Sequence, residues 1–181
     1  RPATQPAHYL NFWRKQGDGR SPVIFDHDGK IIDGLFGVGA SLDILGAAAL
    51  DTPTAATPTI AEGSIVLNGL FFDGIANSSN PSDVSRTGMR AVIAHEIGHF
   101  LNLDHSLLNQ QFAGNGIEAD DIYLPTMFPL FVDDEEQLAT PHSDDQAAYL
   151  DIYTATGAGI SGSVTAQGDP YQGVEVVLRK S

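Results

Sequence analysis

Three histidines and one glutamate share the segment HEIGHFLNLDH, residues 95–105. His95 and His99 are four positions apart, so on an α-helix their imidazoles lie on the same face and can bind one ion. A helix that continued past His99 would point His105 away, so the chain must turn first. We expect that turn at Asn102, because asparagine tolerates the left-handed conformation that ends helices. Three histidines without a fourth protein ligand predict one catalytic zinc ion, with an open position for water.

Glu96 follows the first predicted ligand and is not needed for coordination. Its carboxylate is therefore free to take the proton of a zinc-bound water and to pass it to a departing amine. Zinc lowers the pKa of that water from about 15.7 toward roughly 7 and polarises the scissile carbonyl. These residues predict hydrolysis of peptide bonds with Glu96 as the general base. The alternative, a surface helix that carries histidines by chance, is disfavoured by the spacing and by the helical context.

The elements that must position these residues are predicted from hydrophobic spacing. Apolar residues recur at helical intervals in 85–103, which predicts an amphipathic helix carrying His95 and His99. Residues 104–140 look irregular, and a second helix is expected from about Ser143 to Tyr153. The remaining apolar runs predict strands, the first of them short and the second running into an Asp-Gly turn. These strand segments are residues 9–13, 22–33, 41–50 and 63–73.

The segment HEIGHFLNLDHS resembles the metzincin zinc peptidases, whose motif is His-Glu-x-x-His-x-x-Gly-x-x-His followed by a methionine turn. Asn102 stands where that motif has glycine. Met127, in LPTMFP, is similar to the methionine of that turn, a hydrophobic floor beneath the metal; an ordinary core methionine is the alternative. Within metzincins, Ser106, the MFP sequence and residues 144–153 resemble matrixins. Pro129 occupies the place where astacin-like and serralysin-like members have a tyrosine ligand.

This resemblance implies an α+β fold with a twisted mixed β-sheet over the active-site helix. A loop-rich lower half with the methionine turn and a C-terminal helix would follow. Substrate would lie extended and antiparallel to an edge strand at Ile44–Leu50. Residues 129–132 would wall the pocket for the residue after the cleaved bond. The resemblance also implies an early strand and long helix, and we find no segment that predicts this helix.

The small residues of the expected edge strand have two interpretations. They could let a substrate backbone come close, or they could belong to a tightly packed strand, and the sequence favours neither. The possible substrate strand comprises Ile44, Leu45, Gly46, Ala47 and Ala48.

Asp26, Asp28 and Asp33, in DHDGKIID, are similar to part of a calcium loop, and matrixins commonly bind structural calcium. The run lacks the full Asp-x-Asp-x-Asp-Gly pattern and its terminal glutamate. An Asp-Gly turn is therefore the favoured interpretation, with structural calcium as the alternative. The histidines outside the motif have no ligand spacing with one another, so we predict no second zinc site. They are His8, His27 and His142.

The overall composition limits the possible partners. The 181 residues include 9 basic and 23 acidic side chains, a net charge of -14, so nucleic acid is an unfavourable partner. The absence of cysteine removes disulfides and thiolate metal sites. No apolar run approaches the roughly 18 residues of a membrane span. We expect a secreted monomer that acts on proteins or peptides, with its signal and any propeptide already removed.

Three segments are expected along the chain. Residues 1–153 would form the catalytic domain, whose N-terminal part is either incomplete or built without the early helix. Residues 154–160 would form a linker. Residues 161–181 predict two strands around a turn at 168–170. They resemble the start of a carboxypeptidase-regulatory-like β-sandwich, which suggests a longer multidomain protein. The predicted function is a zinc endopeptidase. A non-catalytic or adhesive metal-binding module on the same scaffold is the alternative, and the intact Glu96 favours the enzyme.

Overall fold

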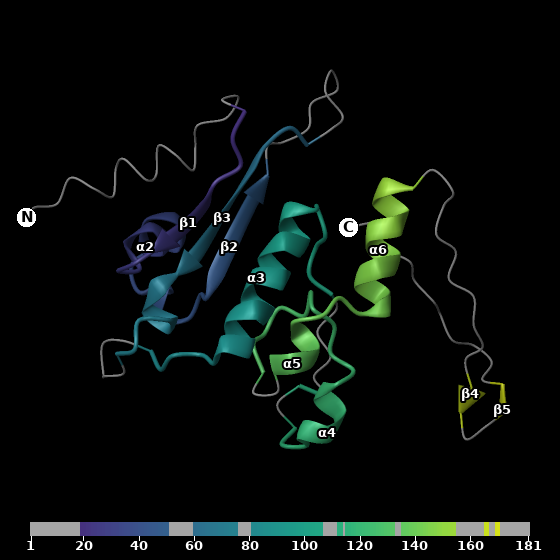
Figure 1. Ribbon diagram of the computed structural model, residues 1–181. Coiled ribbons are helices and arrows are strands. Elements are labelled where there is room, and N and C mark those ends of the chain that lie inside the picture. Colours follow the sequence, from purple (N-terminus) through teal and green to yellow (C-terminus); the bar gives the residue numbers. More distant parts are fainter. Residues whose placement is uncertain are drawn as a thin grey trace, which may run out of the picture.

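The computed structural model describes residues 19–50, 60–75, 81–106, 112–113, 115–132, 135–154, 165–166 and 169–170. Helices and a small three-stranded sheet make up most of this part, so the fold is mixed α and β, as predicted (Figure 1). The strand predicted at residues 9–13 lies outside the described residues.

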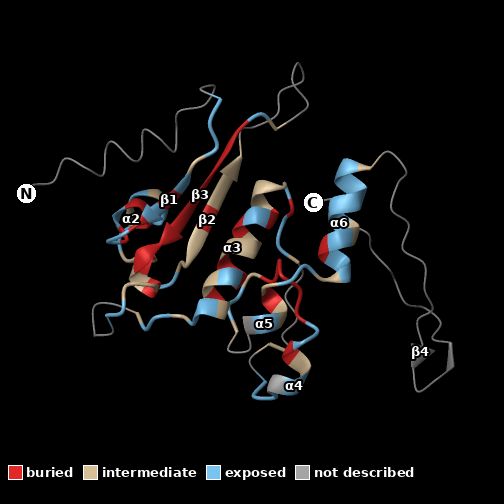
Figure 2. Ribbon diagram, in the orientation of Figure 1, coloured by how far each residue is buried: buried red, intermediate tan, exposed pale blue. Residues whose placement is uncertain are grey.

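The sheet has the strand order β1-β3-β2. Strand β1 (Val23–Asp26) is parallel to the central strand β3 (Gly63–Asn68), and β2 (Gly46–Leu50) is antiparallel to it. Every residue of β3 is buried, as Figure 2 shows. Strand β2 lies at one edge of this sheet, as predicted for the substrate strand.

Two of the expected strands are shorter than predicted. The segment 41–50 begins in a 3-10 helix, η1 (Ala40–Leu42), and only its end forms β2. The segment 63–73 leaves the sheet at Asn68, where a second 3-10 helix, η2 (Gly69–Phe71), begins. The Asn68 side chain explains both bends, because it accepts a hydrogen bond from Leu70 N and donates to the carbonyls of Ser41 and Ile44.

A short helix that the sequence does not predict follows β1. After the expected turn, where Gly29 has a φ of 70°, residues Lys30–Phe36 form helix α2. The buried Asp26 carboxylate accepts a hydrogen bond from Ile32 N at 2.9 Å, which satisfies a free donor of the first helical turn. Ile31 and Ile32 are buried against the sheet. Packing and this bond therefore produce a helix where the β-branched residues favoured a strand.

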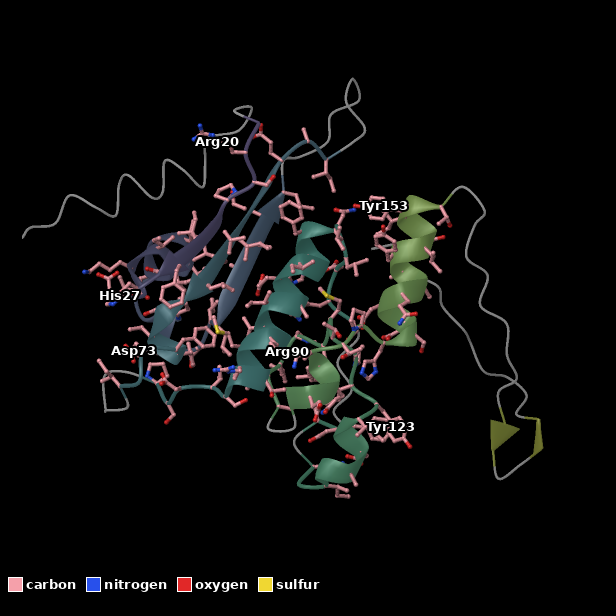
Figure 3. The ribbon with its side chains drawn as sticks, in the orientation of Figure 1. Arg20, His27, Asp73, Arg90, Tyr123 and Tyr153 are labelled. Carbon is pink, nitrogen blue, oxygen red and sulfur yellow. The ribbon has the colours of Figure 1, made fainter. Side chains whose placement is uncertain are left out.

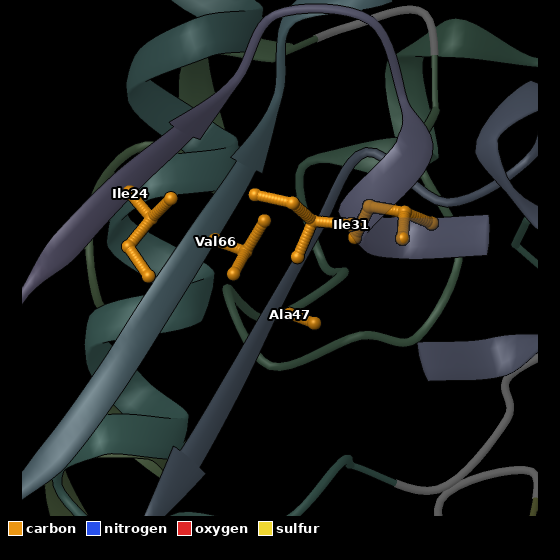
Figure 4. Close-up of a cluster of buried hydrophobic side chains, with 5 residues drawn as sticks. Ile24, Ile31, Ala47 and Val66 are labelled. Atoms are coloured by element: carbon orange, nitrogen blue, oxygen red, sulfur yellow. The ribbon is translucent and has the colours of Figure 1, made fainter. Parts of the chain in front are cut away.

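The sheet lies between α2 and the long helix α3 (Arg86–Phe100), as Figure 1 shows. Side chains of a strand alternate between the two faces of a sheet. Val66 and Ala47 accordingly pack with Ile31 on the α2 side (Figure 4). Ile65 and Leu67 pack with Val92 of α3 on the other side.

Helix α3 matches the predicted helix and begins at the N-cap Ser85, whose hydroxyl accepts a hydrogen bond from Gly88 N. Below it lie two short helices, α4 (Glu118–Asp121) and α5 (Glu135–Leu138), in the segment that was predicted to be irregular. A third cluster of buried residues in this half joins Ala91 of α3 to Leu124, Phe128 and Leu138.

Helix α6 (Ser143–Tyr153) coincides with the second predicted helix. The Tyr153 hydroxyl donates a hydrogen bond to Leu101 O at 3.0 Å, which ties α6 to the end of α3 (Figure 3).

Near the C-terminus, β4 (Thr165–Ala166) pairs antiparallel with β5 (Asp169–Pro170). The second strand thus begins inside the predicted turn at 168–170, and most of the predicted C-terminal β segment lies outside the described residues. No helix in the described part of the chain is long and apolar enough to cross a membrane.

Candidate metal centre

The three predicted ligands come together through their Nε2 atoms. The Nε2 atom of His105 lies 3.1 Å from that of His95 and 3.1 Å from that of His99. Nitrogen ligands of a tetrahedral zinc ion, at about 2.0–2.1 Å from the metal, are about 3.3 Å apart. The histidines therefore lie close enough to bind one metal ion.

The end of α3 brings the third histidine to the other two. Asn102 has a φ of 63°, and among the described residues it is the one non-glycine with a positive φ. Its amide donates to His99 O at 2.8 Å, and Leu103 N donates to Gly98 O at 3.0 Å, which ends the helix. The chain reverses at this residue, so that His105 faces the helix it has just left.

Two backbone carbonyls orient the helical histidines. His95 Nδ1 lies 2.7 Å from Thr126 O, and His99 Nδ1 lies 2.9 Å from Leu103 O. A carbonyl can only accept, so in each neutral ring the hydrogen is on Nδ1 and Nε2 carries a lone pair. Both lone pairs point at His105 Nε2, whose single hydrogen cannot serve both. The arrangement therefore fits a cation at the centre of the three nitrogens.

Burial favours the neutral form of two of these rings. It lowers the pKa of His95 to about 4, although the Thr126 carbonyl opposes this shift and the neighbouring histidines add to it. Burial, with a contribution from His99, also lowers the pKa of His105. Neutral imidazole is the form that binds a metal.

Glu96 is buried beside the histidines, with 5% of its surface exposed. Its Oε2 atom is buried and has no hydrogen-bond partner within the described part of the chain. Without a metal ion, burial alone raises the pKa of this carboxyl to about 8, and a cation held by the histidines would favour its ionised form. An unpartnered carboxylate oxygen in this position is costly unless something binds there. It therefore fits a site that holds a water or a ligand beside a metal ion.

Gly46 of β2 passes directly beside this carboxylate. A Cβ atom at residue 46 would lie 2.9 Å from both Cγ and Oε1 of Glu96, so a larger residue would displace the glutamate. The glycine is thus needed for close packing against the protein's own Glu96.

Met127 packs against helix α3 at Gly98, the residue before His99. A Cβ atom at Gly98 would lie 2.1 Å from Met127 Sδ, and Met127 is almost fully buried. The methionine is therefore packed tightly against α3 beside the histidine site, and its role as a floor beneath a metal stays a prediction.

Asp145 is a positioning residue that sequence reasoning missed. Its buried carboxylate accepts hydrogen bonds from Thr126 N at 3.0 Å, Met127 N at 3.1 Å and His142 N at 2.7 Å. It thereby fixes the segment whose Thr126 carbonyl orients His95. The available signal was an acidic residue in the first turn of a predicted helix, where carboxylates cap backbone amides.

A cleft of about 690 Å³ opens in front of the histidines. The predicted strand residues 44–48 line one side, and residues 129–131 of the predicted wall line the other. Leu130 and Phe131 are exposed at its rim. The cleft therefore joins the predicted edge strand, the histidines and Glu96 in one site.

The other candidate residues serve separate local contacts. Asp28 is bonded to Lys30, and Asp33 accepts from Gly39 N and Ser41 N, while Asp26 caps α2. His27 lies on the exposed turn before α2 (Figure 3), and the His142 ring contacts Gln137 O. Among the described residues, the histidine triad is the one group of three or more such ligands that could hold a metal. His8 lies outside these residues.

No family model, curated protein or solved structure matches this chain. The histidines, Glu96 and the cleft around them are therefore the basis on which its function is inferred.

Proposed function

We propose that this chain is a secreted zinc-dependent endopeptidase with a metzincin-like fold. The observation that carries the proposal is the convergence of three Nε2 atoms beside the buried, unpartnered carboxylate oxygen of Glu96. His95, His99 and His105 would hold the metal. Three imidazoles favour zinc over calcium or magnesium, which prefer oxygen ligands.

Each protein group has a defined part in the proposed hydrolysis. A bound zinc ion supplies a Lewis acid for the scissile carbonyl and lowers the pKa of water toward about 7. Glu96 accepts a proton from the attacking water and returns it to the nitrogen of the departing amine. Thr126 and Leu103 hold the helical imidazoles in the tautomer that presents Nε2.

The outer edge of β2 can hold the substrate backbone. Asn68 N donates to Leu45 O at 2.9 Å, so Leu45 directs its backbone groups toward β3. Along an antiparallel strand, the backbone N–H and C=O groups of successive residues point alternately toward and away from the paired strand. Those of Gly46 and Ala48 therefore point away from β3, to the outer edge. No described strand pairs there. An extended peptide can add at this edge, and antiparallel pairing is the more stable orientation.

The cleft suits a chain that continues past the site in both directions. Among the described residues its lining contains no lysine or arginine that could bind a terminal carboxylate. Most of the other lining residues are apolar. The lining therefore supports cleavage that does not depend on a free C-terminus.

The test is zinc analysis together with cleavage of a denatured protein, comparing the wild type with Glu96→Ala. We expect both proteins to bind one zinc ion, and Glu96→Ala to lose about 100- to 10,000-fold in rate, because the proton transfer is removed. Glu136→Ala, which changes an exposed glutamate of α5, is the matched control and should cleave normally.

Two results would count against this proposal. If the wild type binds zinc and cuts nothing, the metal-binding module becomes the better description. Equal cleavage by wild type and Glu96→Ala would remove Glu96 from its role as the base.

A further inference from the structure

An exposed phenylalanine lies on the face of the sheet opposite the histidines. Phe36 ends helix α2 and is 53% exposed, yet it lines the cleft together with Ile44 and Ala47. Helix α2 covers one face of the sheet and α3 covers the other. The cleft therefore extends around the edge of β2 and offers an apolar surface on both faces.

We propose that Phe36 determines specificity by contacting one side chain of a substrate that is paired with β2. This side chain belongs to the substrate residue opposite Ala47, which is the sequence neighbour of a residue that faces α3. This inference rests on the proposed peptidase function, and it names a substrate class. The preferred substrates are extended polypeptides with two successive large apolar residues near the cleaved bond.

The alternation of β2 carries this assignment. Gly46 faces α3, because a Cβ there would meet Glu96, and Ala48 packs on the same side with Val92. Ala47 faces α2 and packs with Ile31. A peptide added to β2 shares this alternation. Its residues opposite Gly46 and Ala48 face α3, and its residue opposite Ala47 faces α2, where Phe36 lies.

The chemistry of this second contact is apolar. Phe36, Ile44 and Ala47 offer carbon surface, and the small Ala47 leaves room above the strand. Asp43 is the charged lining residue nearest in sequence to Ile44, and it disfavours an acidic substrate residue. A leucine-sized side chain fits these properties.

The test uses the zinc-loaded full chain and decapeptides of alanine and serine that contain one leucine and are cut at one bond. A second leucine or an alanine is then placed at each neighbouring position. For the wild type we expect a peptide with the second leucine directly beside the first to have a kcat/KM about tenfold higher than the peptide with alanine at that position. In Phe36→Ala this ratio should fall to about twofold.

Two further variants control for folding and for general loss of apolar surface. Val38→Ala changes a side chain that is 99% exposed in the turn after α2 and does not line the cleft, so it should keep the tenfold ratio. Phe36→Tyr keeps the aromatic ring and should also keep most of the tenfold ratio. Zinc content and melting temperature show that each variant is folded. An unchanged ratio in Phe36→Ala would overturn the inference.

Binding separates this inference from the proposed function. If the wild type cuts no peptide, the proposed function fails. The affinities of fluorescein-labelled peptides for zinc-loaded Glu96→Gln, with and without Phe36→Ala, then test the subsite by fluorescence polarisation. The inference is supported if the peptide with adjacent leucines binds about tenfold more tightly than the one with alanine, and if Phe36→Ala removes this difference. Equal affinities, or no binding at all, overturn it.

Discussion

At the scale of single residues, two glycines make room for the side chains of the site. Gly46 allows Glu96 to pack against β2, and Gly98 allows Met127 to pack beneath α3. The metal-binding pattern leaves position 98 open to any residue, but the contact with Met127 Sδ does not. Packing in the site therefore restricts more positions than metal coordination alone.

Gly98→Ala should destabilise the protein although alanine favours helices. Met127 is buried and must move, which we expect to cost about 1–3 kcal/mol of unfolding free energy. Gly34→Ala, on the exposed side of α2, is the control and should stabilise by up to about 1 kcal/mol. Urea denaturation measures both. Similar stabilisation by the two substitutions would show that Met127 does not press against α3.

The convergence of the three histidines could be predicted because its constraints are local. The spacing of His95 and His99 on a helix and the turn at Asn102 follow from neighbouring positions in the chain. The contact between Gly46 and Glu96 and the carbonyl of Thr126 facing His95 join distant segments. Such contacts depend on tertiary packing, so the sequence left the role of Gly46 open and gave no indication of Thr126.

At the scale of elements, Asp145 connects helix α6 to the histidine site. Its carboxylate holds three backbone amides, two of them in the segment whose Thr126 carbonyl orients His95. Helix α6 thus helps to position His95 in the candidate metal centre without supplying one of its three histidines.

Asp145→Ala should therefore weaken both folding and zinc binding. Three amides lose their acceptor, which we expect to cost about 3 kcal/mol or more. Zinc affinity should fall about 10- to 100-fold, because His95 loses its fixed orientation. Asp144→Ala, at the exposed neighbouring position, should change stability by no more than about 0.5 kcal/mol. Thermal unfolding and competition with a zinc chelator provide the two readouts. Normal zinc affinity in Asp145→Ala would refute the coupling.

Helix α3 was predictable because its apolar spacing agrees with the turn expected at Asn102. Helix α2 was not, because Ile31 and Ile32 favour a strand locally. Its conformation is decided by the Asp26 carboxylate and by burial against Val66. The shortening of β2 and β3 has a similar origin, since Asn68 bonds to Ser41 and Ile44 far away in the sequence.

At the scale of the whole molecule, the net charge of -14 opposes compaction. We expect sodium chloride to raise the melting temperature by screening this repulsion. Most of the gain should be reached by about 0.2 M, because the Debye length has already fallen to about 10 Å at about 0.1 M. Calorimetry with the ionic strength set by different monovalent salts checks this. A melting temperature that falls as salt is added would mean that attractive ion pairs outweigh the repulsion.

The central claim is that three histidines of one chain hold a zinc ion. X-ray absorption at the zinc edge, on zinc-loaded full chain, tests it most directly. We predict one zinc per chain with three imidazole nitrogens at about 2.0–2.1 Å, and two in His105→Ala. The exposed His27→Ala should give the wild-type spectrum. A wild-type spectrum with fewer imidazoles, or one that His105→Ala leaves unchanged, would contradict the account.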